Sequence, residues 1–311
     1  MIVYSARYHL DIGLHVFPTS KYRLVQARLQ AAGLVQPADL VEPKPATWDE
    51  LALVHTAEYL ARMRDGSVTA DELAQLELPW SPAIVEGFRT MVGGTVMAAR
   101  IACGFDELGI RHSKLGIHIG GGLHHAFPNH GEGFCLFNDV AVAVRVLQAH
   151  GIQRIAIVDL DVHHGNGTAF IFEADSRVFT FSMHQQHNYP VWKPRGSLDI
   201  GLPDGTSDET FLRHLERALP AVMASDSQCV FYLAGADPYE DDQLGGLRLT
   251  KHGLRERDRM VIGTVRRAGV PLVITLAGGY ARNIEDTVAI HVATIEEAVK
   301  ATGAGWAGRA G

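Results

Sequence analysis

The sequence predicts an α/β fold in which helices cover both faces of a mostly parallel sheet. Short runs rich in Val and Ile alternate with longer amphipathic stretches, and these runs contain few polar residues. Strands that are apolar throughout are typical of parallel sheets buried on both faces, and their alternation with helices is typical of βαβ units. No repeat or low-complexity linker divides the chain, so we expect one domain over residues 1–311, with about ten frayed residues at its end.

Five segments are the clearest strand candidates, and five others have apolar residues at helical spacing. The strand candidates are 115–119, 154–160, 178–183, 229–235 and 271–279. The helix candidates are 82–103, 138–150, 208–223, 250–268 and 284–300. Ligands of open α/β sheets bind beyond the carboxyl ends of the strands. We therefore expect the polar and glycine-rich segments that follow these strands to converge at one edge of the sheet.

The composition indicates a soluble globular protein. No apolar run reaches the roughly 18 residues of a membrane helix, and the first residues lack the order of a signal peptide, so we expect a cytoplasmic protein without a membrane partner. A net charge of -7 argues against nucleic acid as a partner and suits a cationic substrate. Cys103, Cys135 and Cys229 are too widely separated for a disulfide framework or a thiolate zinc cage.

Two aspartates and two histidines lie within a few positions in the segment VDLDVHHGNG. Asp161 and His163 are two residues apart, so on an extended chain their side chains share a face and can bind one ion. Asp237, at the matching end of another strand candidate, can supply a third ligand. Two carboxylates and one imidazole balance a divalent ion, leave an open position and suit catalytic zinc. Alternatively, Asp159 and Asp161 cap a helix that begins near Gly167.

A pair of adjacent histidines, His124 and His125, follows three glycines. Glycines allow the backbone to approach a site closely. Two imidazoles beside an activated water are natural proton carriers, provided that a partner fixes the tautomer of each. Asp159 and Asn166 are the available partners. The simpler alternative is that these histidines are hydrogen-bonded core residues without a catalytic role.

Taken together, these segments resemble the zinc-dependent histone deacetylases of the arginase/deacetylase superfamily. The matching segments are GGGLHHAF (120–127), GEGFCLFND (131–139), VDLDVHHGNG (158–167), FSMH (181–184), AGADPYEDDQLG (234–245) and AGGY (277–280). The resemblance is strongest to the class IV type, because of Asn166 and the HQQHNYP loop. It implies a single arginase-like catalytic domain around an eight-stranded parallel sheet sandwiched by helices.

The resemblance also implies a role for each matching side chain. Zinc would be bound by Asp161, His163 and Asp237, and the proton-transfer pair would be His124 and His125, backed by Asp159 and Asn166. Tyr280 matches the tyrosine that stabilises the oxyanion. Many members of the family have an aspartate where Asn166 stands, and a neutral amide stabilises a charged His125 less, which would lower the pKa of that histidine.

A substrate channel and a potassium site are implied in the same way. The channel residues are Gly133, Phe134, Tyr189 and Leu244, with Phe134 and Tyr189 as aromatic walls and Leu244 at the rim. The potassium ligands are Asp159, Asp161, His163, Ser182 and Met183. Glu77 is the candidate for an acidic residue at the rim, as found in some relatives. The loop from 184 to 205 either shapes the mouth of the channel or forms a surface Ω-loop.

The implied reaction is hydrolysis of an acetyl or longer acyl amide on a lysine side chain or related amine by a zinc-activated water. His125 would act as the base and then the acid, His124 would hold the water, and Tyr280 would stabilise the oxyanion. One alternative is an arginase-type ureohydrolase with two manganese ions, but that site needs a D-x-H-x-D pattern, and this chain has D-x-D-x-H. The other is a catalytically silent module that binds acyl-lysine.

Overall fold

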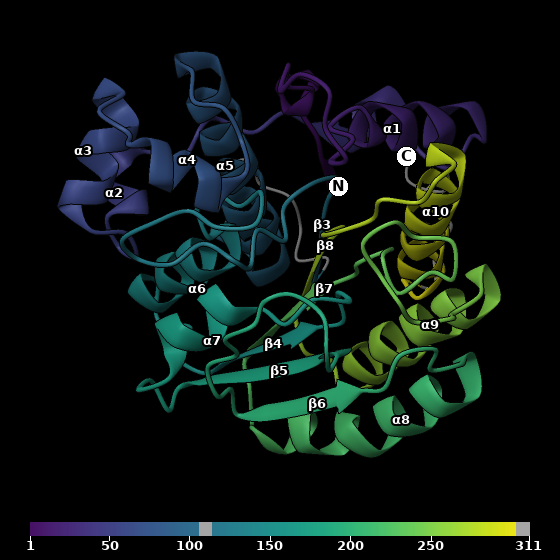
Figure 1. Ribbon diagram of the computed structural model, residues 1–311. Coiled ribbons are helices and arrows are strands. Elements are labelled where there is room, and N and C mark those ends of the chain that lie inside the picture. Colours follow the sequence, from purple (N-terminus) through teal and green to yellow (C-terminus); the bar gives the residue numbers. More distant parts are fainter. Residues whose placement is uncertain (106–113, 303–311) are drawn as a thin grey trace.

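The computed structural model describes residues 1–105 and 114–302, which form an eight-stranded sheet with helices on both faces (Figure 1). All the strand pairs are parallel, and the strand order is β2-β1-β3-β8-β7-β4-β5-β6. The strands are β1 (Ile2–Val3), β2 (Leu40–Val41), β3 (Leu115–His118), β4 (Ile155–Asp159), β5 (Val178–Gln185), β6 (Leu198–Leu202), β7 (Cys229–Leu233) and β8 (Leu272–Thr275). The predicted α/β class and parallel sheet are confirmed.

The helices lie in two layers on either side of the sheet (Figure 1). One layer contains α5 (Pro82–Cys103), α6 (Asp139–Ala149) and α7 (Asn166–Phe172), with α2 (Trp48–Leu51), α3 (Ala57–Asp65) and α4 (Ala70–Leu76) beyond them. The other contains α1 (Lys21–Ala31), α8 (Asp208–Ala224), α9 (Lys251–Arg267) and α10 (Ile284–Lys300). Two short 3-10 helices span Ala6–Tyr8 and Pro37–Asp39. No helix in the described ranges is both long enough and apolar enough to cross a membrane.

All ten elements predicted from the sequence are present, with small differences at their ends. α6 and α9 begin one residue later than predicted because Asn138 and Thr250 are N-caps, whose side chains accept hydrogen bonds from the backbone of Ala141 and Gly253. The predicted frayed tail falls largely on residues 303–311, outside the described ranges. Cys103, Cys135 and Cys229 are free thiols, of which Cys135 and Cys229 are buried and Cys103 is partly buried.

Three strands were not predicted, for two different reasons. β1 and β2 are two residues long each, which is too short for a periodic pattern to appear. β6 lies at the edge of the sheet, where exposed positions alternate with partly or fully buried ones, so it lacks the apolar run of the central strands. By contrast, every residue of β3, β4, β7 and β8 is buried.

The last strand in the chain, β8, lies in the middle of the sheet. It pairs with β3 on one side and with β7 on the other. The group β2-β1-β3 and the group β7-β4-β5-β6 are therefore joined through β8. The carboxyl ends of β3, β8, β7 and β4 are consecutive along one edge of the sheet, which is where the sequence places its polar segments.

Candidate metal centre and active site

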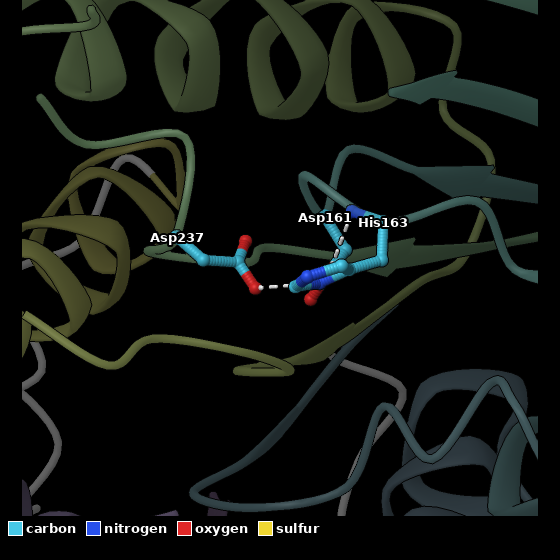
Figure 2. A group of neighbouring side chains, drawn as sticks. All are labelled: Asp161, His163 and Asp237. Carbon is cyan, nitrogen blue, oxygen red and sulfur yellow. Dashed lines mark hydrogen bonds and ion pairs between the residues drawn. The ribbon is translucent and has the colours of Figure 1, made fainter. Parts of the chain in front are cut away.

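Asp161 and His163, paired by their spacing, meet Asp237 from another strand exit at this edge. Each offers one ligand atom, the three atoms lie within 4.8 Å of one another, and all three side chains are buried. Figure 2 shows Asp237 approaching from one side, with Asp161 and His163 on the other. His163 Nδ1 lies 3.0 Å from Asp161 Oδ1 and 3.5 Å from Asp237 Oδ2. Within the described residues, these are the only three His, Cys, Asp or Glu side chains that converge in this way.

One oxygen of this group favours a bound cation. In the part of the chain that the structure describes, Asp237 Oδ2 is buried without a hydrogen-bond partner, whereas Oδ1 accepts from Val162 N at 2.9 Å. A buried carboxylate oxygen without a partner costs free energy that a cation would recover. Gly278 keeps the space beside it open, because a Cβ there would lie 1.9 Å from Asp237 Oδ2 and 2.5 Å from Asp161 Oδ2. Two carboxylates and one imidazole therefore fit a zinc ion.

The charges of the three side chains are strongly coupled. Burial alone would lower the pKa of His163, but its contact with Asp161 and the nearby charge of Asp237 outweigh burial and raise that pKa to about 10. Burial and the charge of Asp161 raise the pKa of Asp237 to about 7. A proton on His163 thus partly compensates the two carboxylates, and a divalent ion bound by the three side chains would take over that role.

The alternative in which the two aspartates cap a helix is wrong. The N-cap of α7 is Gly165, and it provides no side-chain hydrogen bond. Asp159 Oδ1 instead accepts from Asp161 N at 3.1 Å, and Asp159 Oδ2 lies 2.6 Å from His124 Nδ1. Asp161 accepts from Gly278 N at 2.9 Å, which ties the exit of β4 to the exit of β8. Both carboxylates are therefore directed into the site.

The paired histidines have the two partners that the sequence offers. His124 Nδ1 lies 2.6 Å from Asp159 Oδ2, and His125 Nδ1 lies 2.7 Å from Asn166 Oδ1. The two Nε2 atoms are 3.1 Å apart. His124 Nε2 is also 3.8 Å from Asp161 Oδ1, so the pair lies directly beside the metal ligands. Because each Nδ1 faces an oxygen, each Nε2 is directed toward the other imidazole and the centre of the site.

The two imidazoles have opposite electrostatic surroundings. Burial would lower the pKa of His124, but the carboxylates of Asp159 and Asp161 outweigh burial and raise that pKa to about 9. The pKa of His125 is held well below its usual value, chiefly by burial and then by the neighbouring His124 and His163. The hydrogen bond from Asn166 acts in the opposite direction and raises this pKa, so the expected effect of an amide in place of a carboxylate stays a prediction. Of the two imidazoles, His124 is therefore the more basic and His125 the less basic.

The loop before the histidines is held by Asp139, whose role the sequence did not reveal. Its carboxylate accepts from Leu123 N at 2.7 Å and from Gly122 N at 3.0 Å. Gly121 and Gly122 have φ angles of 75° and 79°, in the left-handed region that favours glycine. A Cβ on Gly121 would lie 2.4 Å from Asp139 Oδ2. The triple glycine thus lets the chain wrap closely around a buried carboxylate.

Tyr280 follows β8 and lies over the metal ligands. Its backbone N donates to Asp242 Oδ2 at 2.7 Å, which fixes the turn after the AGG segment. Its ring centroid is 5.9 Å from that of Phe134 and 6.5 Å from that of His163. Burial, with the charges of nearby carboxylates, raises the pKa of Tyr280 well above its usual value. The phenol therefore stays protonated and can donate a hydrogen bond.

A cavity of about 170 Å³ leads to this site. It is lined by Glu77, His125, Gly133, Phe134, His163, Asn188, Tyr189, Leu244 and Tyr280, which include all four predicted channel residues. The ring of Tyr189 is 5.0 Å from that of His125 and lies edge-on to it. Glu77 brings a carboxylate to the mouth. In the 184–205 segment, Asn188 and Tyr189 line the cavity, whereas residues 198–202 form the edge strand β6.

The residues assigned to a potassium site lie together at the ends of β4 and β5. Asp159 and Ser182 are opposite each other in the β4–β5 register, and Met183 is the next residue of β5. Ser182 Oγ lies 3.0 Å from His184 Nδ1, so this hydroxyl already has a partner. The β4–β5 register thus brings Asp159, Ser182 and Met183 together, and the potassium site stays a prediction.

Two buried cations that support the site were not predicted. Lys21 Nζ donates to the Ala277 carbonyl at 2.8 Å and lies 5.4 Å from the Tyr280 ring centroid. Arg257 Nη1 donates to the carbonyls of Gly235 and Leu160, at 2.5 and 3.3 Å, and so joins the exits of β7 and β4. The sequence could show only that a charged residue falls on the apolar face of a helix. Such a pattern does not reveal which group the charged side chain contacts.

The comparison with known proteins agrees with this geometry. The histone deacetylase domain matches residues 15–295. The chain belongs to the histone deacetylase family. It is 43% identical to an uncharacterised protein of Picosynechococcus sp. (89% of this chain, 90% of that protein) and 31% identical to histone deacetylase 2 of Arabidopsis thaliana (92% and 77%). The predicted family is therefore confirmed, and the chain is a hydrolase of the deacetylase family.

Solved structures match the fold of this chain over almost its whole length. The crystal structure of a histone deacetylase homologue complexed with SAHA superposes with a TM-score of 0.79 at 25% identity, covering 96% of this chain and 83% of that one. This match confirms the arginase-like sheet that the resemblance implied. The class IV assignment, based on Asn166 and the HQQHNYP loop, stays a prediction.

Proposed function

We propose that this deacetylase-family chain is a zinc-dependent hydrolase of acetyl or longer acyl groups on lysine side chains or related amines. The observation that carries the proposal is that His163, His125 and Tyr280 line the same cavity. A metal ligand, a neutral imidazole and a protonated phenol therefore face the same space. Amide hydrolysis requires these three functions: activation of water, proton transfer and stabilisation of the oxyanion.

Zinc bound by Asp161, His163 and Asp237 would supply a Lewis acid that acidifies a water and polarises the amide carbonyl. The neutral His125 accepts the proton of the attacking water and then donates it to the leaving amine. His124 stays charged beside Asp159 and holds the water through Nε2. The Tyr280 hydroxyl donates to the oxygen that becomes negative in the tetrahedral transition state.

The cavity supports an extended, cationic substrate. Its walls include the rings of Phe134 and Tyr189, which suit the methylene stem of an acylated lysine. Glu77 at the mouth, together with a net charge of -7, favours a substrate that carries positive charge outside the cavity, at the end remote from the acyl group. We include a potassium ion bound between β4 and β5 in this proposal, with the Ser182 hydroxyl and the Met183 carbonyl among its ligands.

The geometry and the family favour this function over the two alternatives. An arginase-type site with two manganese ions needs additional bridging carboxylates, and Asp161, His163 and Asp237 form the only convergent ligand group in the described residues. A silent binding module would not need a neutral imidazole beside a charged one. We retain both alternatives as outcomes of the following test.

The test is turnover of acetyl-lysine and long-chain acyl-lysine peptides and acylated polyamines, together with a metal count by mass spectrometry. One zinc per chain is expected, with hydrolysis that stops on chelation and returns when zinc is added. Two manganese ions per chain with arginine hydrolysis would favour the ureohydrolase. Saturable peptide binding without turnover by the zinc-loaded protein would favour the binding module.

A hydroxamate on a linear aliphatic or aryl stem is expected to inhibit far more strongly than free acetohydroxamate. Both can chelate zinc, but only the stem can bury apolar surface against Phe134 and Tyr189, which contributes about 25 cal/mol per Å². Competitive inhibition constants measured at one zinc concentration provide the comparison. Equal potency for the two compounds would contradict the role of the cavity as a substrate channel.

A further inference from the structure

Glu132 connects the histidine pair to the wall of the channel. Its Oε1 accepts a hydrogen bond from Asn166 Nδ2 at 2.6 Å and another from the Tyr189 hydroxyl at 2.8 Å. The other side-chain atom of Asn166, Oδ1, lies 2.7 Å from His125 Nδ1. An unbroken chain of hydrogen bonds therefore runs from the imidazole of His125 through the amide to the carboxylate.

The carboxylate of Glu132 is firmly held and stays ionised. Its Oε2 accepts from Gln75 Nε2 at 3.1 Å and lies 3.4 Å from His130 Nε2, while its backbone pairs with Cys135 in both directions. Its side chain is 13% exposed. Burial alone would raise the pKa of Glu132, but the hydrogen bonds from His130 and its other three donors outweigh burial and lower that pKa.

This arrangement determines which way the amide of Asn166 faces. The oxygen and nitrogen ends of an asparagine side chain have nearly the same shape, so packing alone does not select an orientation. An ionised carboxylate only accepts hydrogen bonds, so the amide must present its NH₂ group to Glu132. The oxygen must then face His125. An aspartate at position 166 would need no such partner, because both of its oxygens accept.

The orientation of the amide in turn selects the tautomer of the imidazole. With Oδ1 of Asn166 facing it, His125 Nδ1 carries the hydrogen, and Nε2 is free to accept a proton. With the amide reversed, its NH₂ group would face Nδ1, the hydrogen would move to Nε2, and that atom could no longer act as a base. The two tautomers differ at the atom that faces His124 Nε2, 3.1 Å away, where the N–H of a charged His124 also favours the tautomer without a hydrogen on His125 Nε2.

We propose that Glu132 is a positioning residue for His125, which acts through Asn166 to hold the imidazole in the tautomer whose Nε2 accepts a proton. The carboxylate that supports this histidine is thus one residue further away than an aspartate at position 166 would be. The same oxygen holds the Tyr189 hydroxyl, so the base and one channel wall share one anchor. The inference rests on the proposed function, in which His125 is the proton acceptor.

The direct test is nuclear magnetic resonance of the zinc-loaded protein labelled with ¹⁵N-histidine. The wild type is expected to show neutral His125 with its hydrogen on Nδ1, identified by the loss of its signals in His125→Gln. In Glu132→Ala, a substantial population with the hydrogen on Nε2 is expected. Gln75→Ala removes a neighbouring donor to the same carboxylate without touching Asn166, and it should keep the wild-type tautomer.

Kinetics provide the second readout. Glu132→Ala should lower kcat by about 10–100-fold, the range typical for groups that orient a catalytic histidine, with zinc content near wild type. Any change in KM would report the lost contact with Tyr189. Gln75→Ala should stay within about twofold of wild type, because the carboxylate keeps its bonds to the other donors.

Exchanging the carboxylate and the amide between positions 132 and 166 distinguishes a positioning role of Glu132 from a purely structural one. Asn166→Asp alone would set two carboxylates against each other where Asn166 Nδ2 and Glu132 Oε1 are now 2.6 Å apart. The double variant Asn166→Asp/Glu132→Gln restores a donor and an acceptor, with their positions exchanged. It is expected to be at least about tenfold more active than Asn166→Asp alone.

A double variant no better than Asn166→Asp, or an unchanged tautomer and kcat in Glu132→Ala, would overturn the inference. The tautomer measurement does not depend on turnover. If the wild type hydrolysed no acyl-lysine substrate, the proposed function would fail while the resonance experiment still decided the role of Glu132.

Discussion

Asp237→Ala is expected to lose bound zinc and, with it, hydrolysis of acyl-lysine. It removes one of three ligands and the oxygen that is buried without a hydrogen-bond partner in the described structure. Loss of a direct ligand should weaken zinc binding by more than the roughly 10–100-fold typical of groups that only support a metal ligand. Asp161→Ala should have the same effect. Zinc content after dialysis measures the loss of the metal, and kcat/KM at saturating zinc measures the loss of hydrolysis.

Melting temperatures measured with and without zinc distinguish an aspartate that binds the metal from one that only stabilises the fold. Asp237→Asn keeps the size of the side chain and an oxygen to accept from Val162, but removes a charge that lies close to Asp161. The zinc-free variant should therefore melt at or above the wild-type temperature, while the rise in Tm caused by zinc disappears. Asp241→Ala is the matched control, because its half-exposed carboxylate pairs with Arg282 outside the site. Full zinc and wild-type turnover in Asp161→Ala or Asp237→Ala would make the ligand assignment wrong.

Tyr280→Phe is expected to reduce kcat by about 10²–10³ while changing KM much less. Loss of one oxyanion donor has this magnitude, and the missing hydrogen bond belongs mainly to the transition state. Zinc content and Tm should stay near wild type. The phenylalanine keeps the backbone bond to Asp242 and the packing of its ring against Phe17 and Phe134.

A second tyrosine provides the control for this variant. Tyr239 lies in the ADPYEDD segment, and its hydroxyl is 3.4 Å from Asp286, outside the cavity. Tyr239→Phe should leave kcat within about twofold of wild type, because it removes a single weak, partly exposed hydrogen bond. An unimpaired kcat in fully zinc-loaded Tyr280→Phe would mean that the hydroxyl of Tyr280 does not stabilise the oxyanion.

The fold was predictable where one local signal was sufficient. The central strands are apolar throughout and are followed by glycine or polar residues, so their positions and their shared edge follow from the amino-acid sequence alone. The order of strands in the sheet does not, because nothing in a local pattern indicates that β8 pairs with both β3 and β7. Edge strand β6 was missed because a half-exposed strand lacks the apolar run.

The site was predictable where residues close in sequence share a function. Asp161 and His163 follow from their spacing, and the partners Asp159 and Asn166 lie in the same segment. Glu132 was not predicted, although it lies in a segment used for the family resemblance. Its role depends on the GEGF turn folding back against the start of α7, which brings residues 132 and 166 within hydrogen-bonding distance. Such a contact is a property of tertiary structure, and a single acidic residue between two glycines does not reveal it.

The central position of β8 has a consequence for biosynthesis. A ribosome releases residues 272–275 after every other strand, and until then no pairing joins the group that carries the histidines to the group that carries Asp161, His163 and Asp237. Loop closure between β3 and β8 spans about half the chain, which makes it a slow step in polypeptide folding. A nascent or truncated chain that ends before β8 therefore lacks the strand that joins the two groups, and it also lacks Gly278 and Tyr280, so the site can be completed only once translation has passed the final strand.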